Sequence, residues 1–377
     1  MAGGTTRLTR RGWGLIASGA VLAGGGLGLG YLAPGALGAL VFPTVGLAMA
    51  LARPPRPARV RRRVTATRVR AGESVTVIVE SDGPGEGRVT AAERVTGPAG
   101  TLVLPLGPAR ARIRYELSAQ RRGFLDVGPL DLVRTDPLGL ARAARTVGDE
   151  TVRLLVHPRH HELTVLPAAG GGGRDTSSAA TRATEGSFAG LRELAPGDDV
   201  RRIHWRTSAR RGRLMVRENA DSARPGVTVL VDDRHGRAEL DALAEAAASI
   251  VVSGPDLPVE LRLAGGGYSP PSAGVTAHLD LLAEATSRPD ADFTAACARL
   301  RAGSGRAVVL LSGRAAPADT AAAMDALATR RVLSLVALVG PASGAQPLAA
   351  PPGVRLLQAD TAEAFAAGWN RSRWWTR

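Results

Sequence analysis

The sequence predicts a transmembrane helical hairpin, then a β-sandwich-like domain, and then an α/β domain with a mostly parallel sheet. Three observations predict this order. Two uncharged apolar runs lie near the N-terminus, short runs with alternating apolar residues follow, and strand-like and helix-like runs alternate toward the C-terminus. The 377 residues suffice for two domains of ordinary size besides a membrane element. Aromatic residues make up only 3% of the chain, so both cores must be aliphatic.

The positive charge of the chain is concentrated at one end. The formal net charge is +14, and every basic residue is arginine. Residues 1–63 contain nine arginines and no Asp or Glu, so the remaining chain is only mildly basic, and we expect no nucleic-acid partner. The single cysteine, Cys297, excludes an internal disulfide, and its alanine-rich helical surroundings predict a small buried residue.

Residues 13–52 are predicted to form two transmembrane helices. Trp13–Leu32 is a run of twenty uncharged residues, enough for a helix to cross the roughly 30 Å hydrocarbon layer. After a Pro-Gly turn, Ala36–Ala52 is a second uncharged run of seventeen residues. Both runs are rich in glycine and alanine, which allows two helices to approach closely.

The arginines that flank these runs predict the topology. Residues 1–12 form a basic N-terminus with Arg7, Arg10 and Arg11, and a second arginine run, Arg53–Arg63, follows the hairpin beside the lipid headgroups. By the positive-inside rule both flanks stay cytoplasmic, which predicts a multi-pass plasma-membrane protein with cytoplasmic soluble domains. A cleaved signal peptide is the alternative, but the second apolar run and its arginine stop argue against it.

Residues 64–165 read as a β-rich, sandwich-like domain. Runs at 74–80, 111–117 and 151–156 alternate or are continuously apolar, and clusters of Gly, Pro and Asp between them supply turns. Its simplest role is a spacer or docking module. Histidines 157, 160 and 161 follow the last run, match no zinc spacing and are interpreted as exposed loop residues. Residues 166–189 are rich in Gly, Ser, Thr and Ala and predict a flexible loop.

Residues 226–377 alternate strand-like and helix-like runs. Strands are predicted at 227–232, 259–264, 307–312, 332–339 and 354–358, with helices near 240–251, 275–287, 291–302, 318–330 and 361–371. This alternation predicts a Rossmann-like, mostly parallel sheet covered by helices on both faces. In such folds ligands bind at the carboxyl ends of the strands. The first strand ends at Asp232 and Asp233, so these residues mark a candidate site.

Residues 190–225 hold the densest group of hydrogen-bonding side chains. Guanidinium groups bind carboxylates and phosphates through a planar fork of donors. One interpretation is an internal ion-pair network that holds two domains together, with Trp205 packed between them. The other is a docking surface for a partner or an anionic ligand. The candidate interaction residues are Arg192, Glu193, Pro196, Gly197, Asp198, Asp199, Arg201, Arg202, His204, Trp205, Arg206, Ser208 and Arg210.

The motifs of residues 190–225, in this order, resemble the signature of domain-of-unknown-function family fifty-eight. Upstream, Arg122-Gly123-Phe124 and Asp136-Pro137-Leu138-Gly139 also resemble that family, and the likeness extends over about residues 64–260. The resemblance implies a bacterial, membrane-anchored protein with a von Willebrand factor A-like domain. It also implies a MoxR-type AAA+ ATPase as the partner.

The resemblance further implies a degenerate metal site. Von Willebrand A-like domains carry Asp-x-Ser-x-Ser at the end of the first strand, where oxygen atoms help to bind a divalent cation. Here Asp232 matches, but Arg234 and Gly236 replace the two serines, and an arginine places positive charge where the cation would lie. We expect no cofactor, while Asp232, Asp233 and His235 keep Mg²⁺ binding open.

The motifs do not indicate an enzyme. No Gly-x-Ser-x-Gly or His-Glu-x-x-His sequence occurs, and the absence of lysine excludes a phosphate-binding Gly-x-x-x-x-Gly-Lys loop. Asp199, His204 and Ser208 are the residue types of a hydrolase triad, but types alone do not define one. The leading hypothesis is a membrane-anchored, non-enzymatic adaptor for protein complex assembly or envelope processes. The alternatives are a metal-dependent enzyme using Asp232, Asp233 and His235, and an arginine-driven binder of anionic lipid or nucleic acid.

Overall fold

The computed structural model divides the chain into two units, Met1–His157 and Pro158–Arg377. The structure describes residues 4–56, 58–82, 89–148, 150–164, 188–193, 205–219, 226–254, 257–301, 306–314, 317–328, 333–341 and 349–372.

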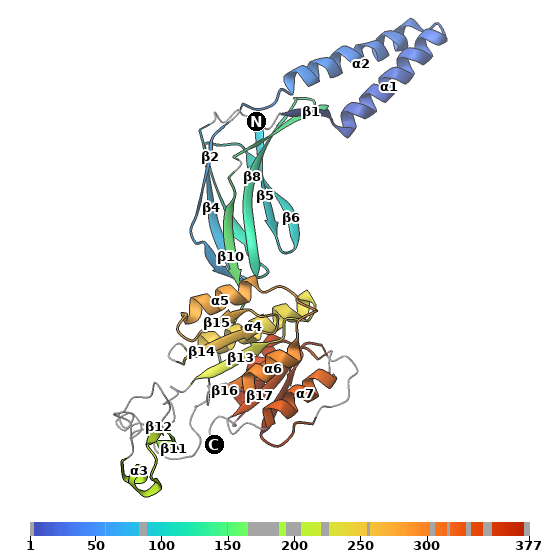
Figure 1. The fold of residues 1–377 in the computed structure, drawn as a ribbon. Coiled ribbons are helices and arrows are strands. Elements are labelled where there is room, and N and C mark those ends of the chain that lie inside the picture. The colour runs from blue at the N-terminus through green and yellow to red at the C-terminus, as the bar shows by residue number, and fades with distance from the viewer. Residues whose placement is uncertain are drawn as a thin grey trace. The chain divides into compact units, whose positions relative to one another are not determined.

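The first unit begins with a helical hairpin. Helices α1 (Arg10–Gly28) and α2 (Leu32–Leu51) pack side by side (Figure 1). Glycine makes this packing possible, because a Cβ atom on Gly26 would collide with the backbone of Gly35. A Cβ atom on Gly38 would likewise collide with the backbone of Ala23. The prediction that small residues let the two helices approach closely is therefore confirmed.

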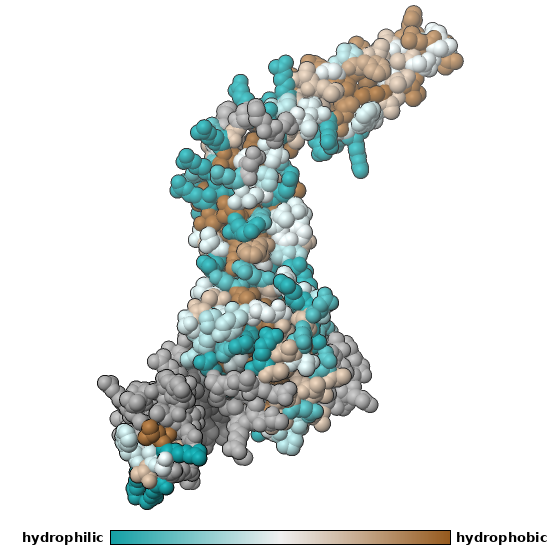
Figure 2. All heavy atoms as spheres, in the orientation of Figure 1, coloured by the Kyte–Doolittle hydropathy of each residue, from teal (hydrophilic) through white to brown (hydrophobic). Residues whose placement is uncertain are grey.

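Among the described helices, α2 alone combines the length and apolar composition of a membrane span. Its twenty residues correspond to about 30 Å of helix. Helix α1 falls short in mean hydropathy, so the predicted two-span topology has support from one helix only. Figure 2 shows hydrophobic residues concentrated on the hairpin. Its exposed large apolar side chains include Trp13, Val21, Leu27, Leu29, Leu32, Leu37, Leu40, Phe42 and Leu47.

Two β-sheets make up the rest of the first unit. In the larger sheet, β8 (Gly123–Thr135) pairs with β5, β9 and β10, while β1, β3 and β6 extend it. The smaller sheet has the order β2-β4-β7. The strands are β1 (Thr5–Leu8), β2 (Val60–Val64), β3 (Arg68–Arg70), β4 (Ser74–Ser81), β5 (Val89–Gly97), β6 (Gly100–Pro108), β7 (Arg112–Ser118), β9 (Ala141–Val147) and β10 (Val152–His157).

Both sheets contribute to one aliphatic core. Val75, Val77 and Val79 of β4 pack with Val127 and Leu130 of β8. Alternate residues of β4 are buried, as expected for a strand with one face on the core. The strands predicted at 74–80, 111–117 and 151–156 are confirmed by β4, β7 and β10.

The residues ahead of the hairpin are not simply a basic tail. Thr5–Leu8 forms β1, which pairs antiparallel with β9. The partner strand lies more than 130 residues away, so local sequence gives no hint of the pairing. The chain therefore leaves the larger sheet through α1 and returns from α2 into the smaller one.

The arginine run after the hairpin includes a core residue. Arg62 lies on β2, its side chain is 2% exposed, and its Nε donates to Glu93 Oε1 at 2.8 Å. Its Nη1 also donates to the carbonyl oxygens of Gly148 and Glu150. The assignment of the whole run to lipid headgroups is therefore wrong at Arg62, because strand alternation turns this side chain into the core.

The second unit contains a six-stranded sheet with the order β15-β14-β13-β16-β17-β18. All neighbours pair in parallel except β14 and β15. The polypeptide therefore reverses its winding direction at the β13–β16 boundary, the topological switch point of a doubly wound sheet. The strands are β13 (Val227–Val231), β14 (Val259–Leu263), β15 (Tyr268–Ser269), β16 (Ala307–Ser312), β17 (Ser334–Val339) and β18 (Val354–Ala359).

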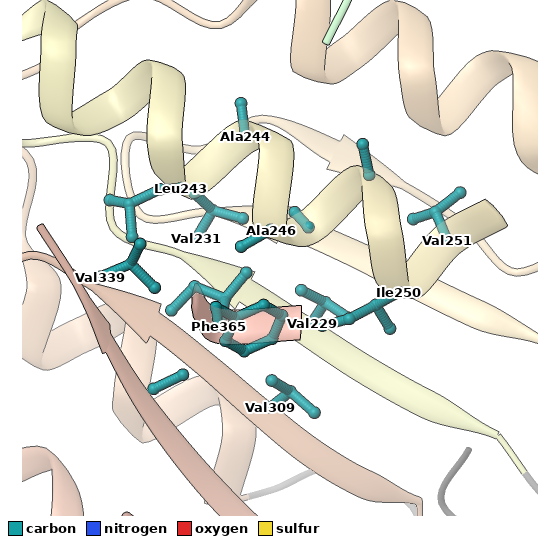
Figure 3. Close-up of a cluster of buried hydrophobic side chains, with 14 of the residues drawn as sticks. Val229, Val231, Leu243, Ala244, Ala246, Ile250, Val251, Val309, Val339 and Phe365 are labelled. Atoms are coloured by element: carbon teal, nitrogen blue, oxygen red, sulfur yellow. The ribbon is translucent and has the colours of Figure 1, made fainter. Parts of the chain in front are cut away.

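Helices cover both faces of this sheet, as predicted. One cluster joins alternate residues of β13 to α4, α5 and α8, with Phe365 among them (Figure 3). The opposite cluster joins Leu230 and β16 to α6 and α7, and it buries Cys297 as expected. The helices are α4 (Arg237–Ser253), α5 (Gly274–Glu284), α6 (Phe293–Arg301), α7 (Pro317–Ala328) and α8 (Ala362–Arg371).

Residues 158–164 pack on this second unit. The backbone amides of His161 and Leu163 donate to the hydroxyls of Ser249 and Ser253 on α4. The His161 ring contacts Glu245 at 2.6 Å, so the interpretation of this residue as an exposed loop histidine is wrong. The predicted flexible loop, residues 166–189, lies outside the described residues except for its last two positions, which begin strand β11 (Phe188–Glu193).

Candidate functional site

The carboxylate of Asp232 lies fully buried at the end of β13. Its Oδ1 accepts from Arg234 Nε at 2.9 Å, and its Oδ2 accepts from Arg234 Nη2 at 3.0 Å and from Ser312 Oγ at 2.8 Å. Burial alone would raise the pKa of Asp232, but interactions that include the hydrogen bonds from Arg234 and Ser312 outweigh burial and hold this pKa well below its ordinary value. Asp232 is thus an ionised group whose charge is compensated within the chain.

Arg234 occupies the position next to Asp232 that a cation would need. The guanidinium spans both carboxylate oxygens, donates from Nη1 to Asp319 at 2.7 Å and stacks over the ring of Phe293 at 4.2 Å. The hydrogen bond to Asp232 raises the pKa of Arg234 further above its ordinary value. A divalent cation needs free oxygen ligands. The residues present therefore do not fit a metal ion beside Asp232.

Asp233 faces a different strand from Asp232. Its Oδ1 accepts from the backbone amide of Gly265, after β14, at 2.7 Å, whereas Asp232 contacts Ser312 at the end of β16. Burial is the main cause that raises the pKa of Asp233. The two adjacent carboxylates thus diverge, and within the described ranges no three His, Cys, Asp or Glu side chains converge on one point.

His235 and Ser312 look like catalytic partners but are engaged with their neighbours. Ser312 Oγ lies 3.2 Å from His235 Nε2, and His235 Nδ1 lies 3.3 Å from Glu239. However, His235 Nε2 accepts from the backbone amide of Gly313 at 2.9 Å, and the Ser312 hydroxyl donates to Asp232. Ser312 is 1% exposed, so a substrate could not reach it without local opening. The cluster serves as a buried polar network that joins β13 to β16.

Sequence reasoning found Asp232, Asp233, Arg234 and His235 but missed Ser312, Glu239 and Asp319. A usable signal existed for Ser312, because it ends a buried apolar strand. The carboxyl ends of neighbouring parallel strands meet at one edge of a sheet. Asp319 lies on α7, beyond a loop, and no local pattern connects it to Arg234.

The arginine-rich segment forms a separate β-α-β element. Strand β11 pairs antiparallel with β12 (Met215–Asn219), so that Arg192 lies opposite Val216 and Glu193 opposite Met215. Helix α3 (Trp205–Arg211) lies between these strands in sequence. The predicted interaction residues Pro196, Gly197, Asp198, Asp199, Arg201, Arg202 and His204 lie outside the described residues.

Ser208 has a structural task within this element. Its hydroxyl oxygen accepts from the backbone amide of Met215 at 2.8 Å, and both residues are buried. The bond fixes α3 to the start of β12. Because Ser208 is enclosed in this way, the residue types of a hydrolase triad noted in the sequence do not provide an accessible nucleophile here.

Helix α3 exposes an aromatic ring and two guanidinium groups. Trp205 is 67% exposed, and Arg206 and Arg210 are exposed as well. We call these three residues the α3 surface. An ion-pair network that holds two domains together would bury Trp205, whereas a docking surface would expose it. The exposure of Trp205 favours docking.

The comparisons with known proteins identify one family. No curated protein matches the chain. The solved "PKD domain of M14-like peptidase from Thermoplasmatales archaeon SCGC AB-540-F20" is 13% identical, with 27% of this chain and 97% of that chain covered and a TM-score of 0.20. "Cwp6 from Clostridium difficile" is 7% identical, with 74% and 41% covered and a TM-score of 0.20. The family described as "Protein of unknown function DUF58" has a model that matches residues 190–371 of this chain, from β11 to α8.

Proposed function

We propose that this protein is a membrane-anchored, non-enzymatic interaction protein that works as an adaptor. The α3 surface carries this proposal, because Trp205, Arg206 and Arg210 are exposed together on a short helix fixed by Ser208. Tryptophan and arginine are among the residues most enriched at binding hot spots. The buried polar site around Asp232 is meanwhile saturated by contacts within the chain.

The proposed partner is a MoxR-type AAA+ ATPase, and the proposed processes are complex assembly or envelope processes. The family resemblance suggests this partner, and the α3 surface offers guanidinium groups suited to its carboxylates. The strand order β15-β14-β13-β16-β17-β18, with β15 antiparallel, supports a von Willebrand A-like assignment for the second unit. The two sheets of the first unit, which share one core, support the β-sandwich-like assignment.

Co-elution tests the adaptor proposal. The full chain in lipid nanodiscs is mixed with a MoxR-type AAA+ ATPase, with and without nucleotide. The wild type should co-elute, and a Trp205→Ala/Arg206→Ala/Arg210→Ala variant should not. Tyr268→Ala/Arg299→Ala is the matched control, since it removes an exposed aromatic ring and an exposed arginine from other elements. Equal co-elution of the wild type and both variants would contradict the proposal.

Both α1 and α2 are proposed to cross the membrane, with the soluble units in the cytoplasm. The arginines on both flanks support this topology through the positive-inside rule. A reporter protein that is active only in the cytoplasm should therefore be active when it is fused after Arg377. Activity of a reporter that requires export would contradict the topology.

Arg234 is proposed to replace a metal ion at the Asp232 site. Titration of the wild type with Mg²⁺ or Mn²⁺ should give no saturable heat in the micromolar range, because both Asp232 oxygens are engaged. Isothermal titration calorimetry provides the measurement. Saturable micromolar binding that an Asp232→Asn variant loses would overturn this assignment and revive the metal-dependent enzyme hypothesis.

A further inference from the structure

The Asp136-Pro137-Leu138-Gly139 motif forms a tight turn between β8 and β9. Asp136 is 5% exposed, its Oδ1 accepts from the amide of Ala141 at 2.6 Å, and its Oδ2 accepts from the amide of Leu138 at 2.8 Å. Gly139 has a φ of +70°, a backbone conformation that favours glycine. The turn thus has a fixed shape that does not depend on any partner.

This turn is bonded to the start of the hairpin. Thr9, the N-cap of α1, donates from its amide to Leu140 O at 2.9 Å and from its hydroxyl to Gly139 O at 2.7 Å. A Cβ atom on Gly12 would collide with Leu140 O, so α1 and the turn are in close contact. Val45 and Ala48 of α2 and its C-cap Ala52 pack with Leu140 and Ala141 in a small cluster, with Leu8 against it. The turn therefore fixes the β-rich part to the beginning of α1 and the end of α2.

The same turn leaves an apolar side chain in solvent. Leu138 is 61% exposed, and Trp13, one helical turn beyond Thr9, is 63% exposed. A buried, fully bonded Asp136 beside an exposed leucine is an unusual use of a tight turn, because polar residues normally occupy exposed turn positions. Trp residues are enriched at the level of lipid headgroups. Both side chains lie where the hairpin leaves its apolar stretch.

Exposed arginines lie on the segments that adjoin this turn and the ends of the hairpin. Arg7 on β1 lies directly opposite Arg142 on β9, a like-charge pairing that costs free energy in water. Arg10, Arg11 and Arg53 are exposed nearby in sequence, and residues 1–63 contain no acid that could pair with them. Anionic headgroups between these guanidinium groups would remove the repulsion and engage their donors.

We infer that the Asp136–Leu140 turn, with Trp13 and the arginines around it, is a docking surface for the interface of an anionic lipid bilayer. Leu138 inserts among the headgroups beside Trp13, while Arg7 and Arg142 bind lipid phosphates. This inference rests on the proposed membrane insertion of the hairpin and adds that the β-rich part is held against the membrane surface.

Site-specific labels test the inference on the full chain in nanodiscs. Single cysteines are placed by Leu138→Cys, Leu102→Cys and Leu40→Cys in a Cys297→Ala background and carry a polarity-sensitive fluorophore. Position 102 on β6 is the matched control, since Leu102 is 58% exposed and apolar like Leu138. Position 40 on α2 reports hairpin insertion. The nanodiscs contain either anionic or zwitterionic lipids, brominated on the acyl chains close to the headgroups.

The label at position 138 should shift its emission to shorter wavelength and lose intensity in anionic brominated nanodiscs, while the label at 102 should not change. The shift at 138 should weaken in zwitterionic nanodiscs and in an Arg7→Gln/Arg142→Gln variant. No quenching at 138 while position 40 is quenched would overturn this inference and leave the anchor intact. No quenching at either position would overturn the proposed membrane insertion as well. Equal quenching at 138 in both lipids would overturn the role of the arginines.

Discussion

Replacing Arg62 by Ala should destabilise the β-rich part by about 3–5 kcal/mol, because removal of one partner leaves the other charge of a buried ion pair uncompensated. Glu93 is 0% exposed and depends on Arg62 for its 2.8 Å contact. Burial raises the pKa of Glu93, and the charge of Arg62 opposes that rise. Without Arg62, Glu93 must take up a proton or be hydrated, and the core of β2, β4 and β5 opens more often.

Hydrogen exchange followed by mass spectrometry measures this effect, since peptides from β4, β5 and β8 report opening of the first unit alone. A loss of about 3 kcal/mol corresponds to amide exchange faster by about 100-fold where global opening controls it. Arg63→Ala is the matched control, because Arg63 is the neighbouring, exposed arginine of β2. If both variants exchange alike, the buried ion pair does not stabilise the sheet.

A second pair of variants separates loss of charge compensation from loss of packing. Arg62→Met/Glu93→Leu removes both charges while it keeps apolar volume. Such replacements are often neutral or stabilising. This double variant should therefore exchange more slowly than Arg62→Ala. Faster exchange in the double variant would show that the charges themselves hold the core.

Replacing Asp232 by Ala should destabilise the α/β unit by about 3 kcal/mol. The change removes the acceptor for Arg234 and Ser312 at the boundary between β13 and β16. Peptides from these two strands should exchange faster, and peptides from the first unit should be unaffected. Asp319→Ala is the control, since Asp319 contacts the same arginine but is half exposed, and exposed ion pairs contribute about 1 kcal/mol or less.

Acidification should act through the same residue. The pKa of Asp232 is lowered in the folded chain, so its contribution to stability is fully present above its ordinary value of 3.8 and is lost as pH falls below that value. Thermal unfolding of the wild type should therefore become easier below about pH 4. The Asp232→Ala variant should lose that part of the pH dependence. An unchanged acid profile in the variant would contradict the assigned pKa direction.

The sheet of the second unit was largely predictable from sequence. Strands 227–232 and 307–312 were recognisable as short apolar runs, because a parallel sheet covered on both faces buries side chains on both sides of a strand. Strand 259–264 was recognisable from its alternation of apolar and charged residues. The short β15 was missed, since two residues carry no periodicity.

The connections that depend on distant partners were not predictable. Strand β1 forms only by pairing with β9. Asp136 does not contact Thr9 directly; it shapes the turn, and a carbonyl oxygen of that turn accepts the hydrogen bond from Thr9. Arg62 offered a signal that was overlooked, because Val60, Arg62 and Val64 share one face of a strand. Treating Arg53–Arg63 as a single basic run concealed the alternation of side chains along this strand. In the candidate site, Arg234 was recognised from its spacing, whereas Asp319 required the fold.

The affinity between the nanodisc-embedded chain and the AAA+ ATPase tests the central claim most directly. A single Trp205→Ala substitution should weaken that affinity by about 30-fold, as expected for an exposed aromatic hot spot worth about 2 kcal/mol. Tyr268→Ala should leave the dissociation constant unchanged. An equal dissociation constant for the wild type and Trp205→Ala would contradict the assignment of the α3 surface as the docking site.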